Sequence, residues 1–208
     1  MRSYTADPAA ARQANANNYI DQTGKYIGEF TLAEAVTSRK GTEGIEFSFK
    51  NEEGQQANYL TLWTYNERGE ALYGFKVLSA IMTVMGVKEL QPKQATIKDK
   101  DGHPRQVVGF PALHNKPVGL VLQKVLYTKN DGKDGYKFNI FAPFNAQSEL
   151  TAKEMLDGAT QPRALAGMIA SLKDKDERNG DSGYGGTPMS AGGGQHDDPF
   201  GDDLGSGF

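Results

Sequence analysis

The chain has 208 residues and a formal net charge of −3, from 23 Lys and Arg against 26 Asp and Glu. Its length allows one domain of about 130–150 residues with extensions, or two small domains. The lack of cysteine excludes a disulfide framework, a thiolate metal site and a cysteine nucleophile. No apolar run approaches the about 20 residues that cross a bilayer, and the first 19 residues lack the apolar stretch of a secretory signal. We therefore expect a soluble, cytoplasmic protein without a membrane partner.

The charge is unevenly distributed along the chain. Residues 179–208 contain ten of the 25 glycines, no Lys or Arg, and five acids, which are Asp181, Asp197, Asp198, Asp202 and Asp203. The remaining residues, 1–178, carry 23 basic and 21 acidic side chains and so a net charge of +2. A Gly-rich segment with so little to bury is predicted to be disordered. The sequence thus predicts a mildly basic body and a disordered acidic tail over residues 179–208.

The first half of the chain predicts a short helix, three strands and a second helix. Asp7 and Pro8 are typical of a helix start, here of an Ala-rich helix in an N-terminal extension over residues 1–23. Apolar residues alternate from residue 24 onward, and short turns separate the alternating runs. Strands are predicted over residues 25–36, 45–50 and 57–65. Residues 74–86 then have helical spacing, with Gly86 as a suitable C-cap.

The second half predicts two more strands and a C-terminal helix. Residues 87–117 are rich in Lys, Pro and Gly and give no clear pattern, and a long connection of this kind is usually functional or disordered. Strands are predicted over residues 117–127 and 136–144, joined by a turn with two lysines. Ser148 and Thr151 are candidate caps at the start of a C-terminal helical segment, residues 148–178, in which residues 161–175 form an amphipathic helix.

Three strands, a helix and two strands are the element order of the OB-fold. We therefore predict a mainly β protein whose residues 24–147 form an OB-fold-like five-stranded barrel, with one helix between strands three and four. The C-terminal helix and the tail lie outside this barrel. The same element order also permits an α+β sandwich.

The third predicted strand separates an aromatic side from an apolar one. Tyr59, Trp63 and Tyr65 fall on one face and Leu60 and Leu62 on the other. If the leucines point inward, the rings are exposed on the sheet surface that OB-folds use for oligonucleotides. Stacking of a base on such a ring contributes roughly 1–3 kcal/mol for any base. The alternative is that the rings pack beneath the N-terminal extension or the C-terminal helix.

Basic residues are grouped in the loops that would flank this surface. In an OB-fold, the loop between strands one and two and the loop between strands four and five border the ligand groove. The candidate phosphate contacts, with the nearby strand positions, are Arg39, Lys40, Lys50, Arg68, Lys129, Lys133 and Lys137. Each of them alone is an ordinary surface charge, so the prediction depends on the grouping.

The tail alternates acids with apolar residues and ends in an aromatic. The candidate partner-binding residues are Asp197, Asp198, Pro199, Phe200, Asp202, Asp203, Leu204 and Phe208. A terminal Phe and its carboxylate beside other carboxylates suit an apolar pocket ringed by Arg and Lys on a partner protein. The alternatives are a solubility tag, and a polyanion that competes with DNA for the protein's own basic groove.

The sequence also resembles a known family. The strands and spacings over residues 24–144, with the turn Ser38-Arg39-Lys40-Gly41 before Ile45, resemble a family of phage-type single-stranded-DNA-binding proteins. The tail separately resembles the acidic, Phe-terminated tails of bacterial and phage proteins of this class. The internal order Asp198-Pro199-Phe200 matches the bacterial pattern, although eight residues follow it. The resemblance implies an OB-fold that protects single strands, and a tail that recruits replication, recombination and repair proteins.

Enzymatic chemistry has little support in the sequence. The three histidines, His103, His114 and His196, are not at metal-ligand spacing, and the Gly-rich run after residue 182 lacks the Lys-Ser/Thr of a phosphate loop. Asp131-Gly132-Lys133 has a form found in some nuclease sites but sits in a predicted turn. We therefore expect no catalysis and no cofactor. Two alternatives to DNA binding remain: a protein-interaction adaptor of a replication or recombination complex, and a homo-oligomer interface on the aromatic side.

Overall fold

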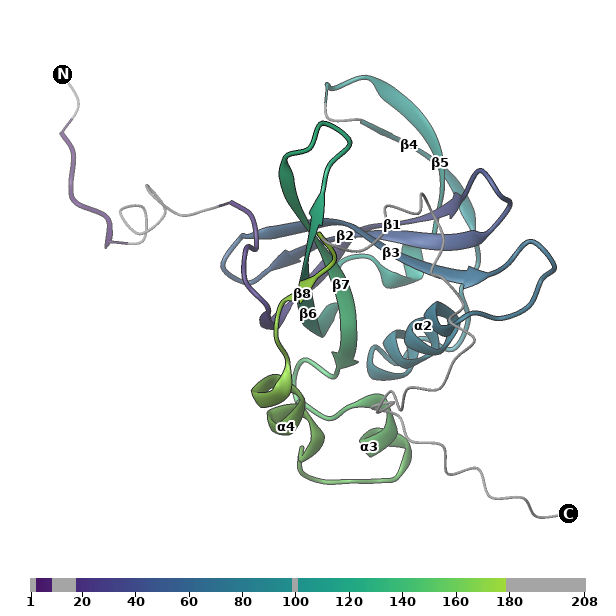
Figure 1. Ribbon diagram of the computed structural model, residues 1–208. Coiled ribbons are helices and arrows are strands. Elements are labelled where there is room, and N and C mark those ends of the chain that lie inside the picture. Colours follow the sequence, from purple (N-terminus) through teal and green to yellow (C-terminus); the bar gives the residue numbers. More distant parts are fainter. Residues whose placement is uncertain (1–2, 9–17, 99–100, 179–208) are drawn as a thin grey trace, which may run out of the picture.

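The computed structural model describes residues 3–8, 18–98 and 101–178, and Figure 1 shows it as a ribbon. It is mainly β. The strands are β1 (Gly24–Thr37), β2 (Glu43–Asn51), β3 (Gln56–Tyr65), β4 (Lys93–Lys98), β5 (Pro104–Gly109), β6 (Pro117–Thr128), β7 (Asp134–Phe144) and β8 (Lys175–Asp176). The helices are α2 (Tyr73–Val84), the 3₁₀ turn η1 (Pro111–Leu113), α3 (Ala152–Leu156) and α4 (Ala164–Ser171). Most of the expected N-terminal helix and the whole acidic tail lie outside the described residues.

Strand β1 organises the sheet because it pairs on both sides. Its second half pairs with β2 in an antiparallel ladder, and its first half pairs antiparallel with β6. A register shift in the β1–β2 ladder between Phe30 and Leu32 lies just beyond Glu29, the last residue of β1 that pairs with β6, and a bulge of this kind bends a strand. Strand β3 pairs antiparallel with β2, and β7 pairs antiparallel with β6.

The core lies between the inner side of this sheet and helix α2. Phe30, Phe47 and Phe49 alternate inward and are fully buried, with the Phe30 and Phe47 ring centroids 4.6 Å apart. Helix α2 contributes its own buried face, including Val77 and Ile81, and packs against β3 and β7. Burying each such side chain contributes about 1.5–3 kcal/mol. This packing fixes which side of β3 is left facing outward.

The expectation of five strands is incomplete. Residues 87–117, which gave no pattern, contain the antiparallel hairpin β4–β5 and the turn η1. Most side chains of β4 are exposed, so the hairpin has no apolar period for a sequence reading to detect. It joins the sheet at one pair, Glu34 with Gly109, and Figure 1 shows it projecting beyond the sheet. The eight strands do not close into a barrel by strand pairing within the described residues.

The C-terminal segment also differs from the single helix expected over residues 161–175. Helix α4 ends at Ser171, and Lys175–Asp176 instead pairs with β6 as β8. Leu165 of α4 is buried with Phe144. This helix therefore covers the end of the β6–β7 ladder that lies opposite the hairpin turn, and it does not cover β3. The expected cap at Thr151 is confirmed, because its side chain and that of Glu154 form a reciprocal capping box.

Candidate nucleic-acid interface

Strand β3 alternates as the sequence predicts. Leu60 and Leu62 are buried in the core, whereas Tyr59 is 73% exposed and Trp63 is 37% exposed. The described part of the N-terminal extension pairs with Gln56 at the start of β3 and leaves both rings uncovered. We call the outward side of β2 and β3 the aromatic face, and it comprises Gly44, Glu46, Ser48, Lys50, Tyr59, Thr61 and Trp63. Tyr65, which the sequence places on this side, does not belong to it, because a register shift pairs Tyr65 with Glu43 and turns its ring toward α2.

Trp63 is positioned by two glycines. The atom Cε3 of its ring lies over Gly44 of β2, where an added Cβ would come within 2.9 Å of it. Gly74, at the start of α2, lies so close to the backbone of Trp63 that a Cβ there would be 2.3 Å from its carbonyl oxygen. The backbone of Trp63 is therefore held from the α2 side, and its ring spreads across the neighbouring strand. This leaves one flat aromatic surface near the β1–β2 loop.

Tyr65 is less available than Trp63. Its ring packs against Phe75 of α2, with centroids 5.3 Å apart, and the residue is only partly exposed. Tyr65 thus supports the edge of the aromatic face, while Trp63 and Tyr59 provide its exposed rings.

Tyr59 owes its exposure to a bulge. Between the pairs Phe47–Leu60 and Phe49–Ala57, the two residues Asn58 and Tyr59 of β3 lie opposite the single residue Ser48 of β2. Tyr59 has a φ of 61°, in the left-handed region that few non-glycine residues adopt. Backbone strain of this kind is common at binding sites. The bulge directs the ring away from the core at the Lys50 end of the face.

The centre of the sheet is acidic, which the sequence reading missed. Glu46 of β2 accepts a hydrogen bond from the Thr61 hydroxyl at 3.1 Å and pairs across the ladder with Glu34 of β1. Glu34 is 5% exposed, and both its oxygens bind the guanidinium of Arg105 from β5 at 2.6 and 2.8 Å. Like charges opposite each other destabilise a ladder, and this bidentate pair offsets one of them. To find this pair of Arg105 with Glu34 from the sequence, one would have had to predict strand β5.

Three of the expected basic residues lie in two loops that touch. Gly41 of the β1–β2 loop lies against the side chain of Glu67 in the β3–α2 loop, so Arg39, Lys40 and Arg68 are carried by neighbouring segments at the Trp63 end of the face. All three are exposed. Lys50 is exposed at the other end, where it pairs with Gln56 of β3.

The remaining basic residues lie on the β6–β7 hairpin, which Figure 1 shows projecting in another direction from the β1–β2 loop. Lys133 lies 3.6 Å from Asp131, and Lys137 lies 3.3 Å from Glu177. These acids offset part of the positive charge that the sequence alone assigns to the hairpin. Lys129 is exposed and has no ion pair within the part of the chain that the structure describes.

The last described residue, Arg178, is tied to the turn end of this hairpin. Its guanidinium binds Asp134 at the start of β7 at 2.9 Å and also binds Asp176 of β8. Hydrogen bonds from Arg178 lower the pKa of Asp176 to about 2, so this pair stays charged at neutral pH. The described part of the chain therefore ends near the turn that carries Lys129 and Lys133. The tail residues expected to bind partners lie outside the described residues.

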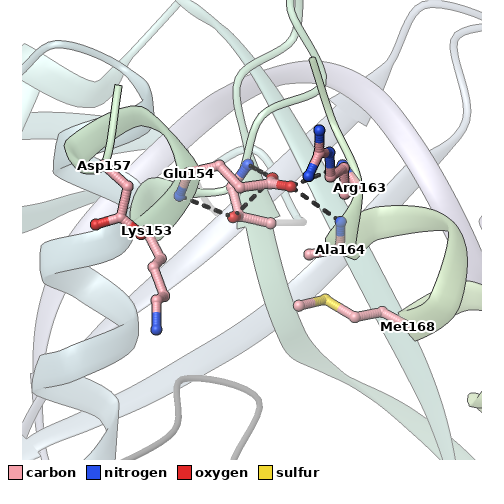
Figure 2. Close-up of a pocket in the computed structure, with 7 residues that line it drawn as sticks. Lys153, Glu154, Asp157, Arg163, Ala164 and Met168 are labelled. Carbon is pink, nitrogen blue, oxygen red and sulfur yellow. Dashed lines mark hydrogen bonds between the residues drawn. The ribbon is translucent and has the colours of Figure 1, made fainter. Parts of the chain in front are cut away.

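A pocket lies between α3 and α4, away from the aromatic face. It is a shallow pocket of about 340 Å³ lined by residues of both helices, and Figure 2 shows Glu154 at its centre. The Glu154 carboxylate accepts hydrogen bonds from the backbone N–H groups of Thr151, Arg163 and Ala164 at 2.7–2.9 Å. Partial burial by itself raises its pKa, but these hydrogen bonds outweigh that effect and lower it from 4.5 to about 2. The carboxylate is thus occupied in joining two helix starts and is not a free ligand.

One of the three histidines, His114, has a structural role. His114 accepts a hydrogen bond through Nε2 from the backbone N–H of Ala33 at 3.0 Å, which holds the chain after η1 against β1. Asp131 likewise accepts from the backbone N–H of Lys133 at 3.1 Å, an ordinary turn contact.

Comparison with known proteins does not assign the chain to a family. No family model matches it, and no curated protein matches it either. No helix within residues 18–98 and 101–178 is long and apolar enough to cross a membrane.

Proposed function

We propose that the protein binds single-stranded DNA on the aromatic face, largely without regard to sequence, and protects it during replication or recombination. The observation that carries the proposal is the exposure of Tyr59 and Trp63 on one strand of a sheet whose other side is a fully packed core. Exposed rings gathered on one side of a rigid sheet form a candidate binding surface, whereas single exposed rings elsewhere do not. Single-stranded nucleic acid suits them because its unpaired bases stack on aromatic rings.

The strand order supports the same proposal. Pairing runs β3–β2–β1–β6–β7, with α2 following β3, and this order is consistent with an OB-like fold. We infer that these five strands are an OB-like core, and that β4–β5 and β8 are additions to it. In that fold the outer side of strands two and three is the oligonucleotide-binding surface, and here it is the aromatic face.

The charges restrict how binding works. A net charge of +2 over residues 1–178 gives little long-range attraction, and the centre of the sheet is acidic. Phosphates are therefore placed at the rims, by Arg39, Lys40 and Arg68 at one end and Lys50 at the other, while the bases lie over the rings. The β6–β7 lysines form a separate set of candidate phosphate contacts on a hairpin that projects in another direction (Figure 1), with Lys129 contributing most because Lys133 and Lys137 already have acidic neighbours.

The tail is proposed to recruit replication, recombination or repair proteins. Its support is the alternation of acids and apolar residues up to Phe208. Because Arg178 is held at the β6–β7 hairpin, the tail begins next to the lysines of that hairpin. A second candidate function is an adaptor with little DNA affinity. The acidic centre of the sheet favours it, because carboxylates repel phosphates.

The test is a binding titration of a labelled single-stranded oligonucleotide with the full chain and with Trp63→Ala. Losing one stacked ring costs roughly 1–3 kcal/mol, which corresponds to an about 5- to 150-fold weaker affinity. Tyr4→Ala is the matched control, because Tyr4 is 88% exposed but lies far from β3 in the sequence and off the face. Log affinity of the full chain is expected to fall with log salt with a slope of about −0.7 per phosphate contacted. No binding at low salt would leave the adaptor as the remaining function.

If the aromatic face is instead an interface between two copies of the chain, Trp63→Ala dissociates an oligomer. Sedimentation of the full chain and the variant without DNA separates this outcome from DNA binding. The proposal predicts that the two sediment alike.

A further inference from the structure

The aromatic face carries a carboxylate oxygen, Oε1 of Glu46, that accepts no hydrogen bond from the described residues. Oε2 of Glu46 accepts from the Thr61 hydroxyl, and no hydrogen bond or ion pair engages Oε1 within the described residues. Its neighbour Glu34 differs, because Arg105 occupies both of its oxygens. Glu46 is partly exposed, so its free oxygen is accessible from the outward side of the sheet.

Glu46 also lies next to the main stacking ring. Trp63 covers Gly44, and Glu46 is the next outward residue of β2 after Gly44. Two residues along a strand are separated by about 7 Å, close to the width of a pyrimidine ring and its substituents. The Thr61 hydroxyl fixes one carboxylate oxygen, so the other has a restricted range of positions. A base stacked on Trp63 therefore presents its edge to a fixed acceptor.

We propose that Glu46 reads the edge of this base by accepting a hydrogen bond from an exocyclic amino group, with cytosine N4 as the preferred donor. A carboxylate accepts hydrogen bonds and donates none, so it favours a base with an amino group there and disfavours one with a carbonyl. The protein then binds all single strands but prefers cytosine to uracil or thymine at one position of its site. This inference rests on the proposed function and names a specificity residue within it.

The experiment compares oligo(dC) with oligo(dU), since the two pyrimidines are nearly the same size and differ at the amino or carbonyl group. With the full chain at one fixed salt concentration, the affinity for oligo(dC) is expected to exceed that for oligo(dU) by about three- to tenfold, which is the typical net value of one hydrogen bond made in exchange for water. Oligonucleotides containing N4,N4-dimethylcytosine keep the ring but lose the amino hydrogens. They are expected to bind no better than oligo(dU), and this probe needs no variant protein.

Glu46→Gln is expected to reduce the preference to within about twofold, because an amide both donates and accepts. Glu52→Gln is the matched control, since Glu52 is an exposed carboxylate in the β2–β3 turn. It changes the net charge by the same amount and is expected to keep the full preference.

The outcomes separate the inference from the function it rests on. If no oligonucleotide binds at low salt, DNA binding itself is wrong. If oligo(dC), oligo(dU) and the dimethylated oligonucleotide bind equally to the full chain, DNA binding stands and the role of Glu46 is wrong. A preference that persists in Glu46→Gln also overturns that role.

Discussion

The junction of α3 and α4 gives a stability prediction that does not depend on DNA. Glu154 satisfies backbone N–H groups at the starts of both helices, through Oε2 to Thr151 and through Oε1 to Arg163 and Ala164. Removing a cap at one helix start costs typically about 1 kcal/mol. Two starts share this carboxylate, so Glu154→Ala is expected to lower the free energy of unfolding by about 2 kcal/mol at pH 7. Glu154→Gln keeps one acceptor oxygen and is expected to cost about half of that.

The same contacts predict a pH dependence. The folded pKa of Glu154 is about 2, below its ordinary value of 4.5. A carboxyl with a lowered folded pKa stabilises the fold above its unfolded pKa, and that contribution is lost as pH falls toward the folded pKa. The difference in unfolding free energy between the full chain and Glu154→Gln is therefore expected to be complete at pH 7 and to shrink between pH 4.5 and about 2.

Urea titrations at several pH values measure this difference. Asp157→Asn is the control, because Asp157 lines the same pocket and no side-chain hydrogen bond to it is seen in the described residues. A surface change of this kind is expected to stay within about 0.5 kcal/mol. A Glu154→Gln effect that is unchanged from pH 7 to pH 3, or one no larger than that of Asp157→Asn, would refute the reasoning.

Three further predictions concern the sheet. Gly119→Ala places a Cβ 2.1 Å from the buried ring of Phe144. We expect denaturant titrations to show a free energy of unfolding that is lower by about 1–3 kcal/mol or more. An unchanged free energy of unfolding would mean that the ring has room to move. Arg105→Ala leaves the buried Glu34 carboxylate without its bidentate partner and is expected to cost about 1–3 kcal/mol, an effect that Glu34→Gln in the same chain should partly restore. Glu46→Gln by contrast is expected to change unfolding free energy by less than about 1 kcal/mol, because the amide oxygen still accepts from the Thr61 hydroxyl and the repulsion between Glu46 and Glu34 is removed.

The regular parts of the fold were predictable because their signals are local. Alternation located β1, β2, β3, β6 and β7, and helical spacing located α2. The same alternation separated Trp63 from Leu62 and so predicted the exposed side of β3 correctly. Burial on one face leaves a period in the sequence that can be read without knowing the partner strand.

The features that were missed depend on contacts between distant segments. Hairpin β4–β5 has almost no buried side and therefore no period. The bidentate pair of Arg105 with Glu34 joins residues 71 positions apart, and it neutralises one of the two carboxylates that face each other at the centre of the sheet. The charge of Lys137 was overestimated for the same reason, because Glu177 reaches it only once β8 pairs with β6. Counting charges along a sequence does not show which of them neutralise each other.

The most direct test of DNA binding on the aromatic face is the fluorescence of Trp63, the single tryptophan of the chain. Because its ring lies on the proposed stacking surface, its emission reports on that surface alone. We predict that a mixed-sequence single-stranded oligonucleotide at low salt quenches this emission in a saturable way, and that the same sequence as a duplex has little effect. An emission that does not change with the single strand, or that changes equally with the duplex, would contradict binding of single-stranded DNA at this face.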